Sequence, residues 1–489
     1  MQDNIKEQIM SLFKNKVLNA LGVERDLYRL LEDGDVEKAI SLMQDHDREV
    51  DEAIKEYNPE THKVKFRPNK YRKGRGNDYI TEKLPRNRPQ YINEVELFFL
   101  LGNDIVWKKQ RGTDEAFGLF MRFLDSTRFY TMMRKAKRLA GSETESAIVY
   151  RVVKDEEDGK LEYKVIPFVV ARSQGYTLRP LIDQYGQMSA FAYGYTLNES
   201  GKSVKHWDIM TSRHLFFCSK DRIGWKIEAY RNTVGKIPVA YFRQPKAWSG
   251  AQERIEREES LDSKMADTNN YFADPIASAT ADVINSMSDP NKPGKLIQLT
   301  TQHSRFEYVN PPTSSETRRD EMASLKESIL FDTLTPDFSF EKMKGLGTLS
   351  GAAIKNAMIL GYIKRKNRVE VYGEMVDRLR SVIIAILKDM NPDKSKELDE
   401  LEVSFDFGEP FAEDKRDKWT DIAKLYQSGL VSLETAVSML ALTDAPQDEI
   451  DRILLKGQED VQAQMDLALL KTEAENEHDN EKTPINAEE

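Results

Sequence analysis

The sequence predicts an α+β fold in which helices frame one antiparallel sheet region. Between Ala147 and Phe242, short runs of alternating apolar and polar residues predict strands. On both sides of this region, apolar residues recur every three or four positions, as is typical of helices. Because the strands form one block and do not alternate with helices, the pattern favours α+β over α/β.

Composition excludes several classes of protein. A chain of 489 residues holds several domain-sized units. Its net charge of −10 argues against a protein that coats nucleic acid by counterion release. The single cysteine, Cys218, excludes an intramolecular disulfide and a thiolate metal cluster, and its apolar neighbours predict a buried strand thiol. No window approaches the roughly 20 apolar residues of a membrane span, and the N-terminus lacks a signal-peptide layout, so we expect synthesis in the cytoplasm.

The N-terminal part reads as helices. Apolar spacing predicts them within residues 1–57, at Glu94–Leu101 and at Ala116–Ala140. The stretch Lys63–Arg88 carries ten basic residues and two acidic ones. One interpretation is a DNA-facing patch. The absence of regular aromatic interleaving favours the other, a charged face paired with acidic neighbours.

The sheet region begins with a hairpin. Ile148–Val153 and Leu161–Val165 flank the turn Glu156–Lys160. Further strands are predicted at Ala190–Thr196, Val204–Met210, His214–Cys218, Trp225–Ala229 and Val239–Phe242.

Two charged helices follow and bracket a small insert. Residues 251–272 and Thr313–Asp332 have helical spacing but only thin apolar stripes, so neither is expected to be stable alone. We expect them to be buried more fully between copies of the chain than within one. The insert between them predicts a short helix at Ile276–Met287 and strands at Lys295–Thr300 and Arg305–Val309.

A Gly-containing loop precedes the longest predicted helix. The loop Phe338–Leu349 exceeds the usual helix–helix connection and is therefore a functional candidate. The blander interpretation, an ordinary connection, stays open. The run Gly351–Leu387 contains no proline and would span roughly 50–55 Å at about 1.5 Å per residue. Gly361 and Gly373 are its candidate kink points.

The C-terminal part predicts a strand and then helices. Leu401–Phe407 alternates as a strand, and helices are predicted at Lys415–Leu430, Leu433–Leu442 and Glu449–Leu455. From Thr472 onward the chain lacks core-forming residues and is predicted to be disordered.

No motif predicts catalysis. Gly201-Lys202-Ser203 lacks the first glycine of a phosphate-binding loop and lies between strands, so it predicts a hairpin turn. Asp406-Phe407-Gly408 is not accompanied by the other kinase motifs. The six histidines have no metal-binding spacing. We expect no enzyme, no metal and no cofactor.

Three short motifs, in order along the chain, carry a family resemblance. They are Pro85-Arg86-Asn87-Arg88 leading to Leu100–Asn103, then Val234–Val239, and then Ser350–Lys355 after a Pro-Asp-Phe and a Gly-rich loop. In this order and spacing the chain resembles the portal proteins of tailed bacteriophages. The resemblance implies a portal-like α+β fold. Its parts would be a wing at 1–250 and 350–410, stem helices at 251–273 and 313–332, a clip at 274–312, a tunnel loop at 333–349, a crown at 411–471 and an acidic tail at 472–489.

The resemblance also implies function and partners. Twelve copies would form a ring at one capsid vertex of the virion, through which double-stranded DNA passes. The terminase large subunit, a head-completion adaptor, and the major capsid and scaffolding proteins would bind it. The implied tunnel-loop residues are Phe340, Lys342, Met343, Lys344, Gly345, Leu346 and Gly347, and those that bind partners at the clip are Asp289, Asn291, Lys292 and Lys295. Two alternatives stay open: a structural connector or scaffold without a DNA channel, and an unrecognised nucleic-acid-processing enzyme.

Overall fold

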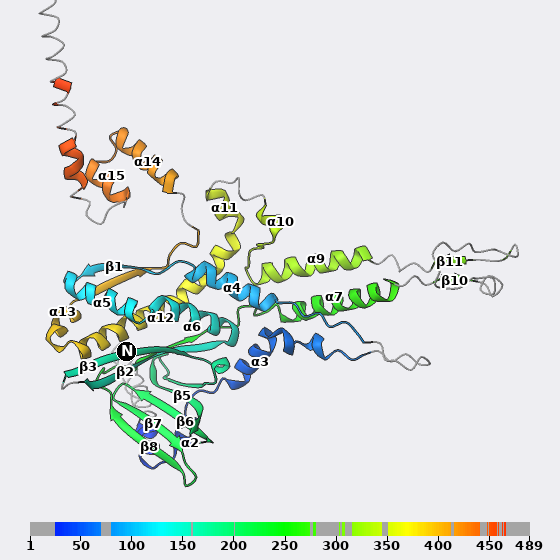
Figure 1. Ribbon diagram of the computed structural model, residues 1–489, viewed down its shortest axis with the longest axis horizontal. Coiled ribbons are helices and arrows are strands. Elements are labelled where there is room, and N and C mark those ends of the chain that lie inside the picture. Colours follow the sequence, from blue (N-terminus) through cyan, green and yellow to red (C-terminus); the bar gives the residue numbers. More distant parts are fainter. Residues whose placement is uncertain are drawn as a thin grey trace, which may run out of the picture. The chain divides into compact units, whose positions relative to one another are not determined.

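The computed structural model divides into two compact units, residues 1–410 and 411–489. The first unit combines helices with antiparallel sheets (Figure 1), so the α+β prediction is confirmed at this level. No described helix has both the length and the apolar character needed to cross a membrane. The structure describes residues 25–69, 80–157, 160–199, 201–273, 315–344, 351–411 and 415–440, with short pieces at 277–279, 303, 306–308, 447, 449–456, 458, 462 and 464–465.

Two antiparallel sheets contain every strand predicted between residues 147 and 242, each longer than expected. The first has the order β3-β2-β9, with β2 at Glu145–Glu157, β3 at Lys160–Val170 and β9 at Val239–Arg243. The second runs β4 to β8 in sequence order: Thr177–Ile182, Met188–Glu199, Lys202–Thr211, His214–Lys220 and Trp225–Arg231. Sequence analysis missed β4. It contains Pro180, which a strand tolerates because β4 lies at the edge of its sheet.

The sheets are stacked between helical layers. One face of the five-stranded sheet packs against helical residues 25–32 and α2 (Val36–Ser41), in a core that includes Leu27, Trp207 and Cys218. Cys218 is a free, buried thiol, as predicted, and its burial raises its pKa to about 12. The other face packs against the three-stranded sheet through residues such as Phe191 and Val239.

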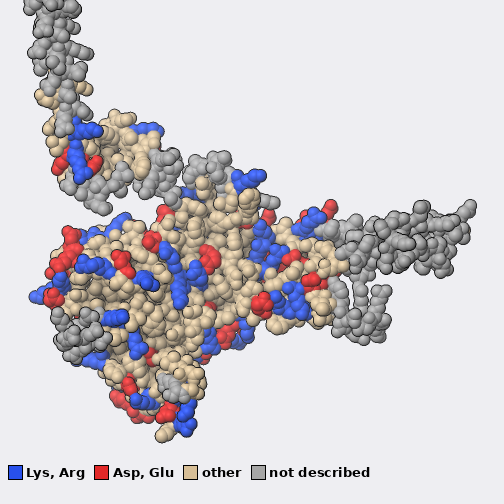
Figure 2. All heavy atoms as spheres, in the orientation of Figure 1, with Lys and Arg blue, Asp and Glu red and all other residues tan. Residues whose placement is uncertain are grey.

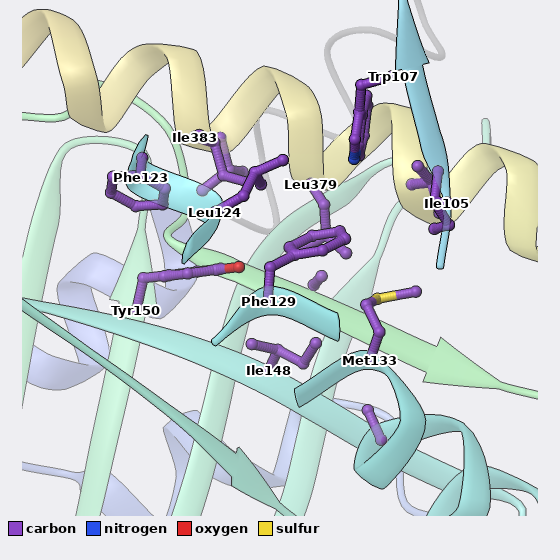
Figure 3. Packing of buried hydrophobic residues seen from close by; sticks show 14 of the residues in the cluster. Ile105, Trp107, Phe123, Leu124, Phe129, Met133, Ile148, Tyr150, Leu379 and Ile383 are labelled. Atoms are coloured by element: carbon purple, nitrogen blue, oxygen red, sulfur yellow. The ribbon is translucent and has the colours of Figure 1, made fainter. Parts of the chain in front are cut away.

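The largest core lies between the three-stranded sheet and the helices. It joins α4 (Arg88–Leu101), α5 (Asp114–Ser126), α6 (Phe129–Glu143) and α12 (Ile359–Met390) to β2 and β9. Figure 3 shows aromatic and aliphatic side chains from α5, α6, β2 and α12 converging there, Phe123, Phe129, Ile148 and Leu379 among them.

A two-stranded sheet closes the same core with segments far apart in sequence. In it β1 (Val106–Arg111) pairs with β12 (Glu402–Asp406), which was predicted as Leu401–Phe407. Strand β1 was missed because Trp107 alone is buried along it, and its other side chains are exposed. Trp107 packs there against Phe120, Phe129 and Phe405.

Two of the long predicted helices are interrupted. The segment Ala116–Ala140 was expected to be one helix, but Arg128 takes a left-handed φ of 50° and separates α5 from α6. The expected helix Gly351–Leu387 is α11 (Gly351–Ala357) followed by α12, which extends to Met390. The break lies at Met358, with φ −103° and ψ 18°, and not at Gly361 or Gly373. Methionine favours helices, so no local signal marks this break.

The insert differs from its prediction where the structure describes it. Strand β10 (Ala277–Ala279) pairs antiparallel with β11 (Phe306–Tyr308), so the expected helix is wrong at its start, because these residues make ladder bonds instead. Strand β11 confirms the strand predicted at Arg305–Val309. The rest of the predicted helix, the strand Lys295–Thr300 and the residues Asp289, Asn291, Lys292 and Lys295 lie outside the described residues.

The second unit contains the helices expected there. Helix α14 (Lys415–Gln427) ends three residues earlier than predicted, and Gly429, with φ 72°, lies in the turn before α15 (Leu433–Leu440). Residues 449–456 are also helical, as expected. The segment from Thr472 onward lies outside the described residues.

Helices α7 (Gln252–Ala273) and α9 (Ser315–Asp332) lie side by side (Figure 1). Positive and negative side chains are interspersed over this part of the surface (Figure 2). At their base, Ile255 and Ile329 join a small core around Trp248. Ile329 and its neighbour Leu330 are the only buried residues among the described side chains of α9.

A row of ion pairs, which we call the α7 ladder, covers another face of α7. It supports the favoured interpretation of the basic stretch Lys63–Arg88, a charged face paired with acidic neighbours. In the described part, Lys63, Arg67, Arg86 and Arg88 pair with carboxylates of α7, and Lys65 pairs with Glu60, whereas Lys83 forms no ion pair with a described residue. Residues 70–79 lie outside the described chain. The pairs are His62–Glu259 at 2.6 Å, Lys63–Glu256 at 2.9 Å, Arg67–Asp267 at 2.6 Å, Arg86–Asp262 at 2.6 Å and Arg88–Glu258 at 2.7 Å.

The ladder makes a testable prediction about stability. Arg88 binds both carboxylate oxygens of Glu258, which is 2% exposed, so Arg88→Met leaves a buried charge without its partner. We expect the free energy of unfolding to fall by about 3–5 kcal/mol, measured as a lower melting temperature by calorimetry. Lys63→Met removes an exposed cation from the same row and should cost at most about 1 kcal/mol. Equal losses in the two variants would contradict this account.

Candidate functional site

The segment that follows α9 starts from a fixed turn. The Thr333 hydroxyl donates to the carbonyl of Ile329 at 2.7 Å and lies 3.0 Å from the Thr335 hydroxyl. Between them Leu334 takes a left-handed φ of 50°. Both threonines are buried, so the direction in which the chain leaves α9 is set by internal hydrogen bonds.

Tyr91 of α4 holds the next residues. Its hydroxyl donates to the carbonyl of Pro336 and accepts from the backbone N–H of Phe338, both at 2.8 Å. Asp337 accepts from the backbone N–H of Ser339 and pairs with Lys326 at 2.7 Å. Burial alone would raise the pKa of Asp337, but the bonds from Lys326 and Ser339 lower it, so the carboxylate stays ionised.

Beyond Ser339 the segment is exposed. The loop predicted at Phe338–Leu349 is wrong in its first part, because Phe340–Met343 form one helical turn, α10, closed by the bond from the Lys344 N–H to the Phe340 carbonyl. Phe340 is 83% exposed, and Met343 is exposed as well. The predicted site residues Gly345, Leu346 and Gly347 lie outside the described residues.

Two lysines accompany the exposed ring. Lys342 and Lys344 are both exposed, and neither forms an ion pair with any other residue that the structure describes. Their charges therefore remain accessible from solvent. The structure thus places Phe340, Lys342, Met343 and Lys344 on and directly after one short helical turn, and their assignment to a tunnel loop stays a prediction.

Helix α4 contacts the chain before and after this exposed segment. Phe338 packs against Phe98 and Phe99, with ring centroids 6.3 Å apart in each case. Beyond the break between α11 and α12, the ring centroids of Tyr362 and Phe99 are 5.6 Å apart. Gly361 lies against the ring of Phe99 as well. We call Tyr91, Phe98 and Phe99 the α4 platform. It contacts the chain at Pro336 and Phe338 and again at Gly361 and Tyr362.

Sequence analysis missed the α4 platform. The predicted helix Glu94–Leu101 included Phe98 and Phe99, but their partners are far along the chain. The sequence carried no signal for it, because the 38% exposure of Phe98 on α4 is a property of the folded chain. Gly361 was noted only as a kink point, whereas its role is to admit the Phe99 ring.

A buried cluster of charges fixes the platform in place. The Glu96 carboxylate, 2% exposed, contacts the amino groups of Lys137 at 2.5 Å and Lys364 at 3.2 Å and the guanidinium of Arg368 at 3.0 Å. Burial alone would raise the pKa of Glu96, but these three cations hold it well below its usual range. Burial lowers the pKa of Lys364 to about 8. The cluster ties α4 to α6 and α12.

The arrangement suits binding and movement better than catalysis. Its accessible groups are an aromatic ring, a thioether and two ammonium groups, which offer contacts but no nucleophile with an adjacent base. Among the described residues, no group of three or more histidine, cysteine or acidic side chains is placed to hold a metal. Gly201 has φ 78° in the β5–β6 turn, so the apparent phosphate-loop motif is a hairpin turn, as predicted.

Comparison with known families decides the assignment. Residues 41–463 match the family described as "Phage portal protein, SPP1 Gp6-like". The chain belongs to this family. Portal proteins are structural and not enzymatic, so the expectation of no enzyme is confirmed and the alternative of an unrecognised enzyme is wrong. A portal or connector role follows from membership of the family.

Solved structures similar to this portal protein come from gene transfer agent particles. One, titled "Neck of native GTA particle computed with C12 symmetry", is 12% identical with a TM-score of 0.39, over 73% of this chain and 89% of that chain. Another, titled "Virion of native gene transfer agent (GTA) particle", is 11% identical with a TM-score of 0.37, over the same shares. No curated protein matches the sequence.

The contact between α12 and the platform predicts opposite effects for two glycines. A β carbon at Gly361 would lie 2.3 Å from Cζ of Phe99, whereas nothing lies within 4 Å of one at Gly373. We expect Gly361→Ala to reduce the free energy of unfolding by about 1–3 kcal/mol through overpacking. Gly373→Ala, the matched control in the same helix, should increase it by up to about 1 kcal/mol. Thermal unfolding measures both, and a stabilised Gly361→Ala would contradict the proposed packing.

Proposed function

We propose that this portal protein forms a ring at one capsid vertex of a phage virion and that double-stranded DNA passes through the ring. The match of residues 41–463 to the portal family is the observation that carries this proposal. The exposure of α9 supports it, because a helix that buries only two of its described side chains in one copy has surface left for a neighbouring copy. By the family's organisation the ring would have twelve copies.

The segment 333–349 would line the narrowest part of the channel. Lys342 and Lys344 are exposed and would meet the phosphates of passing DNA. Phe340 and Met343 would pack against the next copy. Because the α4 platform holds the chain at Phe338 and again at Gly361, the residues between these two points would be able to change conformation without disturbing the body. Gly345 and Gly347 would provide the backbone freedom that such a change requires.

The remaining charge distribution fits passage of DNA without tight binding. The net charge is −10, and four of the six described basic residues of the stretch 63–88 are paired in the α7 ladder. Acidic walls would repel the phosphates while a few lysines guide the duplex. The force would come from another protein, the terminase, and the channel would be passive.

Other parts of the chain would meet the partners. The clip at 274–312, with Asp289, Asn291, Lys292 and Lys295, would contact the terminase large subunit during packaging and a head-completion adaptor afterwards. The crown at 411–471 would face the capsid interior, and the wing would contact the major capsid and scaffolding proteins. These assignments rest on the family resemblance.

A second candidate function is a structural connector without a DNA channel. The α7 ladder supports this candidate, because its ion pairs engage basic side chains that would otherwise be available to bind DNA. The two candidates differ in whether DNA passes through the assembled particle.

Assembly separates these proposals from a monomeric role. Native mass spectrometry of the purified chain should give one closed oligomer with twelve times the chain mass, and electron microscopy should show rings with a central opening. A monomer or dimer at all concentrations would contradict the ring. Rings without an opening would favour the connector.

The exposed lysines give a test of the channel. Lys342→Ala with Lys344→Ala removes two accessible charges from each copy, and exposed charges act only within about 8–10 Å. We therefore expect rings to assemble normally but DNA packaging to be slower or incomplete, measured as nuclease-protected DNA in heads assembled in vitro. Lys135→Ala with Lys202→Ala is the matched control, since both are exposed lysines elsewhere. Unchanged packaging in the first variant would show that this segment does not act on DNA.

A further inference from the structure

A polar cavity of about 470 Å³ lies where turns of the five-stranded sheet meet α12. Ser189 comes from the start of β5, Ser212 from the turn between β6 and β7, and Lys236 from the loop before β9. Arg378 and Ser381 come from α12. Hydrogen-bond donors from four separate parts of the chain therefore converge on one space.

The two cations of this cavity have little to bind within the chain. Arg378 donates through Nε to the carbonyl of Val239 at 3.2 Å, and its terminal nitrogens make no hydrogen bond to the described residues. Lys236 donates to the hydroxyl of Ser381. In the part of the chain that the structure covers, neither forms an ion pair. Arg378 is half-buried, and charged groups removed from water are normally paired. Its guanidinium and the exposed ammonium group of Lys236 beside it therefore leave positive charge at this cavity that an anion could neutralise.

The charged groups around the cavity also leave these two cations without a carboxylate partner. Burial lowers the pKa of Lys236, and the positive charges of Lys388 and Arg378 lower it further. The carboxylate that lines the cavity, Asp377, is bound to Arg380 at 2.8 Å. Asp399 is bound to Lys388. Asp377 and Asp399 are thus engaged with other cations, and Asp389, which lines the neighbouring cavity, accepts from the hydroxyl of Thr233.

Three hydroxyl groups complete the donor set. Ser189 and Ser212 are half-buried, and their side chains make no hydrogen bond to any described residue. The third is Ser381, which already accepts from Lys236. Two cations and three hydroxyls arriving from different directions suit a tetrahedral anion with several acceptor oxygens. A carboxylate, which is planar and has two oxygens, would leave donors unsatisfied.

We propose that this cavity binds a phosphate group, either as free phosphate or as part of a nucleic-acid backbone. A neighbouring cavity of about 500 Å³ shares Gly235, Lys236 and Ser381 and leads to Lys388, so there is room for a larger molecule that carries the phosphate. The site does not involve the segment 333–349. It stands whether or not that segment lines a channel.

The test uses the full-length protein and a charge-matched control. Lys236→Gln removes an exposed cation whose only bond is to Ser381, so the fold should be kept. Lys226→Gln removes an exposed cation of β8 outside the cavity. Inorganic phosphate is titrated by calorimetry, and a short DNA duplex by fluorescence anisotropy. We expect Lys236→Gln to weaken phosphate-dependent binding at least about tenfold and Lys226→Gln to leave it unchanged.

A second variant keeps both cations. Ser189→Ala with Ser212→Ala should weaken binding by about three- to tenfold, because two neutral hydrogen bonds are lost, and Arg378→Lys should retain part of the affinity. Saturable binding of inorganic phosphate that depends on Lys236 supports a site for the free anion. Binding of the duplex alone, with the same dependence, supports nucleic acid as the source. No binding of either, equal binding by Lys236→Gln, or equally tight binding of polyglutamate would overturn the proposal.

Discussion

The buried carboxylate of Glu96 is the interaction on which the arrangement of the first unit depends. Three cations from two other helices surround it, and Gln244 donates to it at 3.0 Å while accepting from Tyr372 at 2.7 Å. A buried charge is tolerated only when it is compensated in detail, so α4, α6 and α12 are held in one relative position. Apolar packing alone would allow small shifts among these helices. The charged cluster does not.

The position of α4 in turn determines how the exposed segment is presented. Helix α4 carries both Glu96 and the α4 platform. The platform contacts the chain at Phe338 and again at Gly361. The break at Met358 lets α12 follow the core while α11 leads back to the segment. A rigid frame therefore supports a short exposed stretch.

Charge is used in two different ways in this portal protein. In the α7 ladder, cations and carboxylates pair across elements far apart in sequence, and a helix with a thin apolar stripe obtains a buried polar face. Lys342, Lys344, Lys236 and Arg378 instead lack carboxylate partners among the described residues. The first set stabilises the fold, and we propose that the second binds phosphates.

The sequence by itself determined the α+β class, the strands between residues 147 and 242, the positions of most helices and the resemblance to portal proteins. These follow from local periodicity, turn residues and short motifs, which are readable along the chain. It also favoured pairing of the basic stretch 63–88, because composition suggested a charged face. Only the tertiary structure decided the partners in the α7 ladder, the pairing of β1 with β12, the break at Met358 and the grip of the α4 platform on Phe338 and Gly361. Each of these depends on contacts between distant segments, where packing and charge compensation override local propensity.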